Sequence, residues 1–404
     1  MTSHKAILAL ALLVPAMGCG GEIVEKTEGT FGADVAYLEQ HVETVVLGQE
    51  GARVAIVPAW QGRVMTSTSA GDSGPSYGWI NRELIDQGQL QPHMNAFGGE
   101  DRFWIGPEGG QFSVFFKAGD PFDLEHWQTP PAVDTEPYQL VSSSPTEAVF
   151  SHDIHLENYS GAAFDLRVDR TVDLLSAEGV VSLLGEVPGS GISMVAFESR
   201  NRLTNTGANA WDKQSGLLSV WILGQFNPSP QTTVIIPYRG DAGDETLGPV
   251  VNDAYFGKVP ADRLVIDPGV IFFRADGTFR SKIGLPAARA RSVLGSWDRS
   301  HGVLTLVQFT RPEGAVDYVN SMWEIQKDPF AGDVVNSYND GPPAPGQKPL
   351  GPFYELETSS PAAALSPGES LEHVHRTIHL SGGREALNAV ALRVLGVDLD
   401  DVPW

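Results

Sequence analysis

The chain has little of what disulfide, thiol or nucleic-acid chemistry requires. One cysteine, Cys19, stands among 404 residues, so no disulfide can form within the chain and the fold must depend on a hydrophobic core. Basic residues are also few, with 27 Lys and Arg against 50 Asp and Glu, and the formal net charge is −23. Because nucleic acids bind to basic surfaces, we expect no nucleic-acid partner.

Long apolar runs are missing as well. The apolar segment 6–14 is too short to stay in a membrane as a spanning helix. Lys5 precedes it and the small residues Ala16 and Gly18 follow it, which is the pattern of a cleaved signal peptide. The segment 16–19 resembles a bacterial lipobox, whose cysteine becomes the acylated first residue of the mature protein. An ordinary signal peptide with an incidental cysteine is the alternative.

These features predict a signal peptide over residues 1–18, a lipidated tether over residues 19–29 and an acyl group on Cys19. Gly20 stands where an Asp would retain a lipoprotein in the inner membrane. We therefore expect a cell-envelope protein, lipid-anchored to the outer membrane of a Gram-negative bacterium. The negative charge would repel anionic headgroups, so membrane contact is expected through the lipid anchor only.

The rest of the composition favours an all-β protein. Hydrophobic residues make up 42% of the chain and charged residues 19%, and 44 Gly and 28 Pro provide frequent turns. No Pro/Ser-rich linker divides the chain, so we predict one domain over residues 30–404. Alternating or short apolar runs predict strands at 53–57, 63–68, 111–116, 147–152, 163–172, 195–204, 217–223, 232–237, 270–274, 278–284, 303–309, 318–324, 353–358 and 371–379.

So many strands indicate a large β-sandwich, because they do not remain in one open sheet. Helical spacing of apolar residues appears only near the two ends of this domain. It follows Thr30, where Phe31, Val35 and Leu38 recur, and it follows Ser381. We therefore predict short terminal helices packed on the sandwich.

Four polar segments, 95–110, 119–127, 198–211 and 352–370, contain the candidate functional residues. The first two combine charged and aromatic side chains on glycine-bearing loops, as ligand-binding loops often do. The alternation of the third places Arg200 on a polar strand face, either a cleft wall or a solvated edge. In the fourth, Glu355 and Glu357 share a face, and their repulsion favours a proton on one of them unless a cation neutralises the pair.

Metal and glycosidase chemistry are the alternatives at the level of residues. His373, His375 and His379 share one face of the last predicted strand, and a His-x-His pair can bind a transition metal. Strand histidines beside an arginine are more often surface residues, so we predict no metal and no cofactor. A glycosidase would place Glu100 or Glu108 across a cleft from Glu357.

Several motifs resemble landmarks of the galactose mutarotases and related aldose epimerases, in order and rough spacing. They are the segments 54–64, 95–99 followed by Trp104, 203–207 followed by Trp211, and 356–358 followed by Pro361 and 367–369. The similarity is closer still to uncharacterised bacterial lipoproteins of that fold. It implies a galactose mutarotase-like β-supersandwich.

The resemblance also implies a chemistry. In the mutarotases a glutamate takes the anomeric hydroxyl proton while a histidine protonates the ring oxygen. Glu357 falls on the glutamate position, but the family histidines are replaced by Thr206 and Phe97. Threonine cannot act as an imidazolium acid, so His126 or His93 would have to supply the proton.

We therefore predict an extracytoplasmic lipoprotein that binds a mono- or oligosaccharide in an open groove. Two alternatives are an aldose epimerase-type enzyme with Glu357 as general base and His126 as acid, and a non-catalytic structural lipoprotein. The expected ligand-binding residues are His93, Glu100, Arg102, Trp104, Trp127, Arg200 and Glu355.

Overall fold

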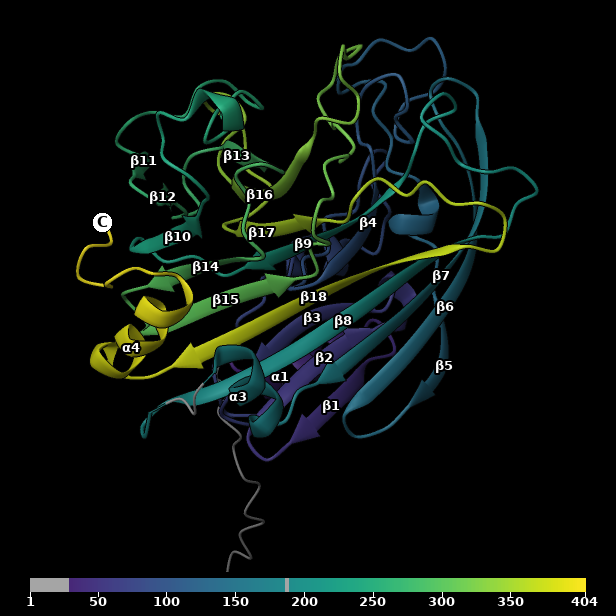
Figure 1. The fold of residues 1–404 in the computed structure, drawn as a ribbon. Coiled ribbons are helices and arrows are strands. Elements are labelled where there is room, and N and C mark those ends of the chain that lie inside the picture. The colour runs from purple at the N-terminus through teal and green to yellow at the C-terminus, as the bar shows by residue number, and fades with distance from the viewer. Residues whose placement is uncertain (1–28, 186–188) are drawn as a thin grey trace, which may run out of the picture.

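The computed structural model describes residues 29–185 and 189–404, whose arrangement is shown in Figure 1. The predicted signal peptide, Cys19 and residues 19–28 of the predicted tether lie outside the described residues. Within the described ranges, no helix is both long enough and apolar enough to cross a bilayer.

The described chain forms three antiparallel sheets of ten, five and three strands. The ten-stranded sheet has the order β11-β12-β10-β14-β15-β18-β8-β7-β6-β5, the five-stranded sheet β13-β16-β17-β9-β4, and the smallest β1-β2-β3. The ten strands are β5 (Gln139–Ser143), β6 (Glu147–Glu157), β7 (Ala163–Leu174), β8 (Ser193–Asn205), β10 (Thr232–Pro237), β11 (Leu264–Asp267), β12 (Val270–Arg274), β14 (Val293–Asp298), β15 (Val303–Phe309) and β18 (Ser370–Ser381). The others are β1 (Val45–Gln49), β2 (Ala52–Val57), β3 (Arg63–Thr68), β4 (Arg102–Gly106), β9 (Ser219–Phe226), β13 (Ser281–Pro286), β16 (Asp333–Asn339) and β17 (Tyr354–Ser359).

The ten-stranded sheet is one layer of a sandwich, and the two smaller sheets form the layer that packs on it. β7 shows why, because its buried Phe164, Leu166 and Val168 alternate with exposed charged residues. These side chains join Val54 and Ile56 of β2 in one hydrophobic core. A second core joins β13, β16 and β17 to β10, β14 and β15. The predicted all-β sandwich is confirmed.

Helices cover part of the opposite face of the ten-stranded sheet. α3 (Ala177–Leu184) and α4 (Arg384–Val394) pack there against β15 and β18, and both helices lie below these two strands in Figure 1. α1 (Phe31–Leu38) and α2 (Arg82–Gln87) lie in the N-terminal part of the chain, and short 3-10 turns occur at Pro58–Trp60, Pro131–Val133 and Glu245–Leu247. The predicted terminal helices correspond to α1 and α4.

Two of the predicted strands are not strands, and both bear on the site, while β1, β4, β5, β11, β14 and β16 were not predicted. Residues 111–116 and 318–324 are loops rather than strands. Their apolar side chains suggested strand pairing, but Phe115, Phe116 and Trp323 instead pack on other aromatic side chains. The aromatic side chains of these two segments therefore cover a sheet, and the segments are not strands of it.

Candidate functional site

The five-stranded sheet turns one face to the core and the other to a set of polar side chains. Strand register decides which residues share the second face, because side chains alternate along each strand. Glu357 lies opposite Leu223 and Asn336, while Glu355 lies opposite Gln225 and Tyr338. We call this second face the site face; it carries Arg102, Trp104, Trp221, Gln225, Lys282, Asn336, Glu355 and Glu357.

Glu357 is the central carboxylate of the site face and is wholly buried. Its Oε2 accepts a hydrogen bond of 2.9 Å from Trp221 Nε1 and one of 3.0 Å from Lys282 Nζ. Its Oε1 has no hydrogen-bond partner. Since buried polar atoms are almost always bonded, this oxygen marks a place for a donor that the protein does not provide.

Lys282 brings a positive charge from β13 to this carboxylate. Its Nζ lies 4.8 Å from the ring centre of Trp221 and 5.5 Å from that of Tyr255. Burial would lower the pKa of Lys282, but the negative charges of Glu357, Glu108 and Glu355 outweigh it and raise that pKa above its ordinary value. The ammonium group therefore stays charged.

Glu355 forms the second carboxylate of the site face. It accepts hydrogen bonds from Arg102 at 3.2 Å and from Gln225 at 2.9 Å. Burial and the charge of Glu357 nevertheless raise the pKa of Glu355 to about 8. The sequence predicted that one of these two neighbouring carboxyls would hold a proton, and Glu355 holds it near neutral pH.

Aromatic rings stand beside these charges. The guanidinium of Arg102 lies 4.3 Å from the ring centre of Trp104. Trp104 in turn contacts Phe115, Trp127 and Trp221, at ring-centre distances of 5.2, 6.3 and 5.4 Å. The indole nitrogens of Trp104 and Trp127 are buried without partners. Rings and unused N–H groups of this kind suit a ligand with both apolar faces and hydroxyls.

Further acids stand at the edge of the site face. Asp333 accepts hydrogen bonds from Tyr255 at 2.6 Å and from Asn252 at 3.1 Å, and burial raises its pKa. Removal from water raises the pKa of Glu108 to about 7, an effect that Lys282 opposes and the negative charge of Glu357 reinforces. The region thus holds more carboxyl groups than cations. The raised pKa values of Glu355, Glu108 and Asp333 favour the protonated, neutral form of these groups.

Loops cover the site face. The space left between these loops and the site face is a cavity of about 20 Å³, measured as the volume that the centre of a water molecule can occupy. It is lined by Glu108, Trp221, Tyr255, Lys282 and Asn336 among others. A single water needs about 10–15 Å³ by this measure, so the cavity holds about one water. The groove that the sequence predicted to be open is closed here, because Tyr255, Trp127 and Trp323 come from loops that fold over it.

Of the predicted site residues, the structure brings together Arg102, Trp104, Trp127, Glu355 and Glu357. Glu100 and Arg200 lie elsewhere. Glu100 is buried between the sheets, where it accepts hydrogen bonds from Ser67 and lies 2.8 Å from His379 Nε2. The Arg200 side chain is 42% exposed and pairs with Asp173. The polar strand face at 198–204 is therefore partly solvated and not a cleft wall, although β8 lies inside the ten-stranded sheet and not at its edge.

The two histidines considered as acids hold other positions. His126 is in a loop, where its Nδ1 lies 2.7 Å from Asp123 Oδ1, a bond that raises the pKa of His126. His93 Nδ1 lies 2.7 Å from the carbonyl oxygen of Trp127. No hydrogen bond connects either ring with Glu357. Thr206 is exposed, and Phe97 stacks on Trp60 at 4.2 Å.

The three histidines of β18 are buried and not at the surface. His373 and His375 both bond the hydroxyl of Thr358, each at 2.9 Å. Burial lowers the pKa of His373 to about 3 and that of His375 to about 4, so both rings are neutral. Their strand lies inside a sandwich whose two faces are covered. In the part of the chain that the structure describes, no group of three or more His, Cys, Asp or Glu is placed to hold a metal ion.

Glu100 belongs to a set of buried polar and charged side chains that we call the inner cluster, made of Glu100, Asp101, Arg170, Ser199 and Asn201. Arg170 donates to Asp101 Oδ1 at 2.6 Å, and Ser199 donates to Asp101 Oδ2 at 2.7 Å. Arg170 also bonds Asn201 and the carbonyl of Gly62. These contacts tie the segment before β4 to the ten-stranded sheet.

Sequence reasoning missed Lys282, Trp221 and Tyr255. The one signal for Lys282 was its position within the predicted strand 278–284, where it stands between Ser281 and Ile283. Tyr255 gave no signal, since it reaches Asp333 from a loop distant in the sequence.

Comparison with known proteins gives a family and a fold. A family model described as a family of unknown function (DUF6786) matches residues 29–403. Among curated proteins, no sequence match is found. The Slr1438 protein of Synechocystis sp. PCC 6803 is similar in structure, with 13% identity and a TM-score of 0.52 over 85% of this chain and 96% of that one.

A putative mutarotase (YeaD) from Salmonella typhimurium has 10% identity and a TM-score of 0.50, over 85% of this chain and 92% of that one. A putative aldose 1-epimerase from Escherichia coli K12 has 13% identity and a TM-score of 0.49, over 84% and 99%. At 10–13% identity these similarities concern the fold alone, and the one to the putative mutarotase, with a TM-score of 0.50, confirms the galactose mutarotase-like fold that the sequence motifs predicted.

Proposed function

The chain belongs to DUF6786, a family of unknown function, and we propose that it binds a carbohydrate on its site face. The observation that carries this proposal is Glu357 Oε1, a wholly buried carboxylate oxygen with no partner. A sugar hydroxyl is a donor of the size and kind that such an oxygen accepts. The mutarotase-like fold supports the proposal as an analogy only.

The neighbours of Glu357 supply the other interactions that a sugar needs. Lys282 and Arg102 carry donors, and Gln225 Oε1 is a second unpartnered acceptor. Trp104 and Trp127 offer rings for the C–H face of a pyranose and indole N–H groups for its oxygens. A pocket built in this way combines a few oriented polar groups with aromatic walls.

Binding requires the covering loops to withdraw, because the cavity in the closed state holds about one water. Tyr255 is the side chain that the ligand must displace first. It lies against both Lys282 and Asp333, and it comes from the loop between β10 and β11. The ligand would then take over the contacts that Tyr255 makes in the free protein.

Aldose epimerisation is a second candidate, and the free oxygen of Glu357 is the observation that favours it. In this reaction Oε1 would take the anomeric hydroxyl proton while a donor protonates the ring oxygen. The bond between the anomeric carbon and that oxygen then breaks, and the aldehyde recloses on either face. His126 and His93 are the acids that the sequence predicted; Lys282, which is charged and 3.0 Å from the same carboxylate, is the donor on the site face itself.

A glycan array followed by thermal unfolding with the selected sugars tests both candidates. A ligand at a hundred times its Kd stabilises the folded protein by about 2.7 kcal/mol, so the melting temperature should rise. Glu357→Gln should weaken binding by roughly tenfold to a hundredfold, because it removes a charged acceptor. The matched control is Glu372→Gln, which changes a partly exposed carboxylate of β18 that pairs with Arg202.

The outcomes separate the functions. Sugar-dependent stabilisation that Glu357→Gln removes and Glu372→Gln retains supports carbohydrate binding. Accelerated mutarotation of glucose or galactose in a polarimeter, lost in Glu357→Gln, supports the enzyme. If no glycan is retained and no melting temperature shifts, the carbohydrate proposal is wrong and the structural lipoprotein remains.

The cellular address is part of the same proposal. Cys19 in its lipobox-like segment supports a lipid-anchored protein of the cell envelope, exported and held at the outer membrane. Growth with an alkyne fatty acid should label the wild-type chain, and Cys19→Ser should abolish the label and release the protein from the membrane fraction. Labelling that persists in Cys19→Ser would contradict the anchor.

A further inference from the structure

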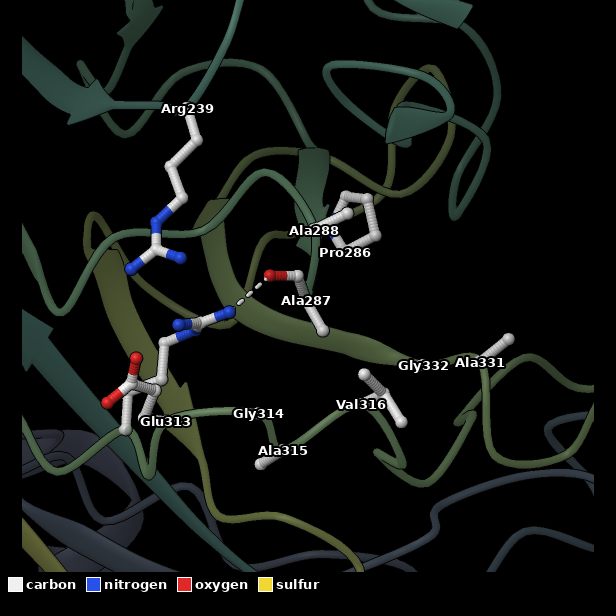
Figure 2. Close-up of a pocket in the computed structure, with 11 residues that line it drawn as sticks. Arg239, Pro286, Ala287, Ala288, Glu313, Gly314, Ala315, Val316, Ala331 and Gly332 are labelled. Carbon is white, nitrogen blue, oxygen red and sulfur yellow. Dashed lines mark hydrogen bonds between the residues drawn. The ribbon is translucent and has the colours of Figure 1, made fainter. Parts of the chain in front are cut away.

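A second hollow lies beyond the end of β13, and its lining shares no residue with the site face. Its volume is about 610 Å³, within the range of pockets for small molecules. Figure 2 shows it between the chain at 286–288, the loop that follows β15, and Ala331 and Gly332, which directly precede β16. The lining residues are Arg239, Pro286, Ala287, Ala288, Arg311, Glu313, Gly314, Ala315, Val316, Ala331 and Gly332.

Two arginines without carboxylate partners line this hollow. Among the described residues, neither Arg239 nor Arg311 forms an ion pair. Arg239 is exposed, and Figure 2 shows its side chain reaching into the pocket. Arg311 donates one hydrogen bond of 2.6 Å to the carbonyl of Ala287, the dashed line in Figure 2, and its Nε is buried without a partner.

The two guanidinium groups repel each other. Burial lowers the pKa of Arg311, and the positive charge of Arg239 lowers it further. Such a pair is unexpected in a chain of net charge −23, where a carboxylate partner is easy to provide. Glu313 also lines the pocket, but it is exposed and forms no ion pair with either arginine. The described residues therefore leave the positive charge of the two arginines open to an anionic ligand.

The remaining walls define the rest of that ligand. They are formed by proline, alanine, valine and glycine residues, and no hydroxyl, amide or aromatic side chain lines the pocket. A sugar would find neither a ring to stack on nor side-chain partners for its hydroxyls here. Small apolar walls instead favour an aliphatic body.

We propose that this hollow binds an organic anion with a carboxylate or phosphate head held by Arg239 and Arg311 and a short aliphatic body held against Ala287, Ala315 and Val316. The two fork-shaped guanidinium groups match the oxygens of either head. The proposal does not depend on carbohydrate binding, since the two sites share no lining residue.

Calorimetric titration of the purified protein with hexanoate, hexyl phosphate and hexanol tests the proposal. Both anions should bind and hexanol should bind at least about tenfold more weakly, because it lacks the charged acceptor. The ratio of the two anion affinities tells which head the pocket prefers. Arg239→Gln should weaken the binding of both anions by about tenfold or more. Its fold should be unaffected, because this guanidinium forms no hydrogen bond or ion pair with any residue that the structure describes.

Glu313→Gln should strengthen the same binding severalfold, since it removes a negative charge from the lining. Arg202→Gln, at an exposed arginine of β8, is the control that changes net charge without changing the pocket. Equal binding of hexanol and hexanoate, unchanged binding in Arg239→Gln, or no binding by either anion would overturn the proposal. Arg239→Gln should keep the sugar-dependent rise in melting temperature expected for the site face. A loss of anion binding in this variant can then be distinguished from a loss of carbohydrate binding.

Discussion

The inner cluster and the site face both bury carboxylates against cations, but they use their oxygens differently. In the inner cluster, both side-chain oxygens of Asp101 accept hydrogen bonds, and so do both of Glu100. On the site face, Glu357 receives two donors on one oxygen and none on the other. Buried charge alone therefore does not identify a binding site in this molecule.

The difference follows from what each region has to do. A fully bonded ion pair fixes how two sheets meet, because every donor and acceptor has one position. A carboxylate with an unused oxygen costs stability and contributes nothing to the sandwich. Such groups are rare in folded proteins, and the explanation proposed for Glu357 is a ligand that supplies the donor. The comparison yields predictions in which stability and binding respond separately.

The largest expected effect concerns stability and comes from Arg170→Ala in the inner cluster. This change leaves Asp101 buried without its cation, and we expect the free energy of unfolding to fall by roughly 3–5 kcal/mol. Urea denaturation measures this change. Arg202→Ala, which breaks an exposed pair with Glu372, should cost only about 0–1 kcal/mol. If both variants lose the same amount, the inner cluster is not a structural tie.

The sequence predicted the fold class and part of the site, and the residues around β4 show where it stopped. Glu100, Asp101 and Arg102 are adjacent in the sequence and looked equivalent on a glycine-bearing loop. Arg102 is instead the first residue of β4, and its side chain lies on the site face. Asp101 and Glu100 point to the interior. Only the pairing of β4 with β9 decides between these directions.

The histidines of β18 show a similar limit. The alternation that groups His373, His375 and His379 was predicted correctly. Whether that shared face meets solvent depends on Thr358 of β17 and Glu100, which reach it from other parts of the chain. Lys282 is the same case, because β13 becomes part of the site only by pairing with β16. The local sequence pattern predicts which residues share one face of a strand. The pairing of strands that are distant in the sequence determines which side chains that face contacts.

A smaller effect is expected from Gly284→Ala, at the edge of the site face. An added Cβ would lie 2.1 Å from Asp333 Oδ2 and 2.6 Å from Asn336 Nδ2, so these side chains must move. We expect a loss of about 1–3 kcal/mol in the free energy of unfolding, together with faster amide exchange around Tyr255, whose hydroxyl bonds Asp333.

Gly243→Ala is the matched control for this loop region, because nothing lies within 4 Å of its added Cβ. If Gly284→Ala leaves exchange around Tyr255 unchanged, then Tyr255 does not depend on Asp333 for its position. The loop that carries Tyr255 would then be held in place by other contacts, as the inner cluster is. The proposed opening of this loop would be wrong.

The smallest and most selective effect is the dependence of stability on pH. The pKa values of Glu355 and Glu108 are raised to about 8 and about 7 by burial, above those of the unfolded chain. The folded protein therefore holds protons that the unfolded chain has released, and stability falls as pH rises from about 4.5 to about 8. Glu355→Gln, a neutral mimic of the protonated acid, should flatten this decline.

Measurement between pH 6 and 9 is made on both proteins, because groups outside the site face, such as His126 with its raised pKa, also titrate in this range and contribute equally to wild type and variant. Urea unfolding of wild type and Glu355→Gln should then give curves that approach each other at low pH and diverge as pH rises. Parallel curves would show that Glu355 is ionised like an ordinary surface acid. Its pairing with Arg102 would in that case be complete, and the site face would hold no stored proton for a ligand to displace.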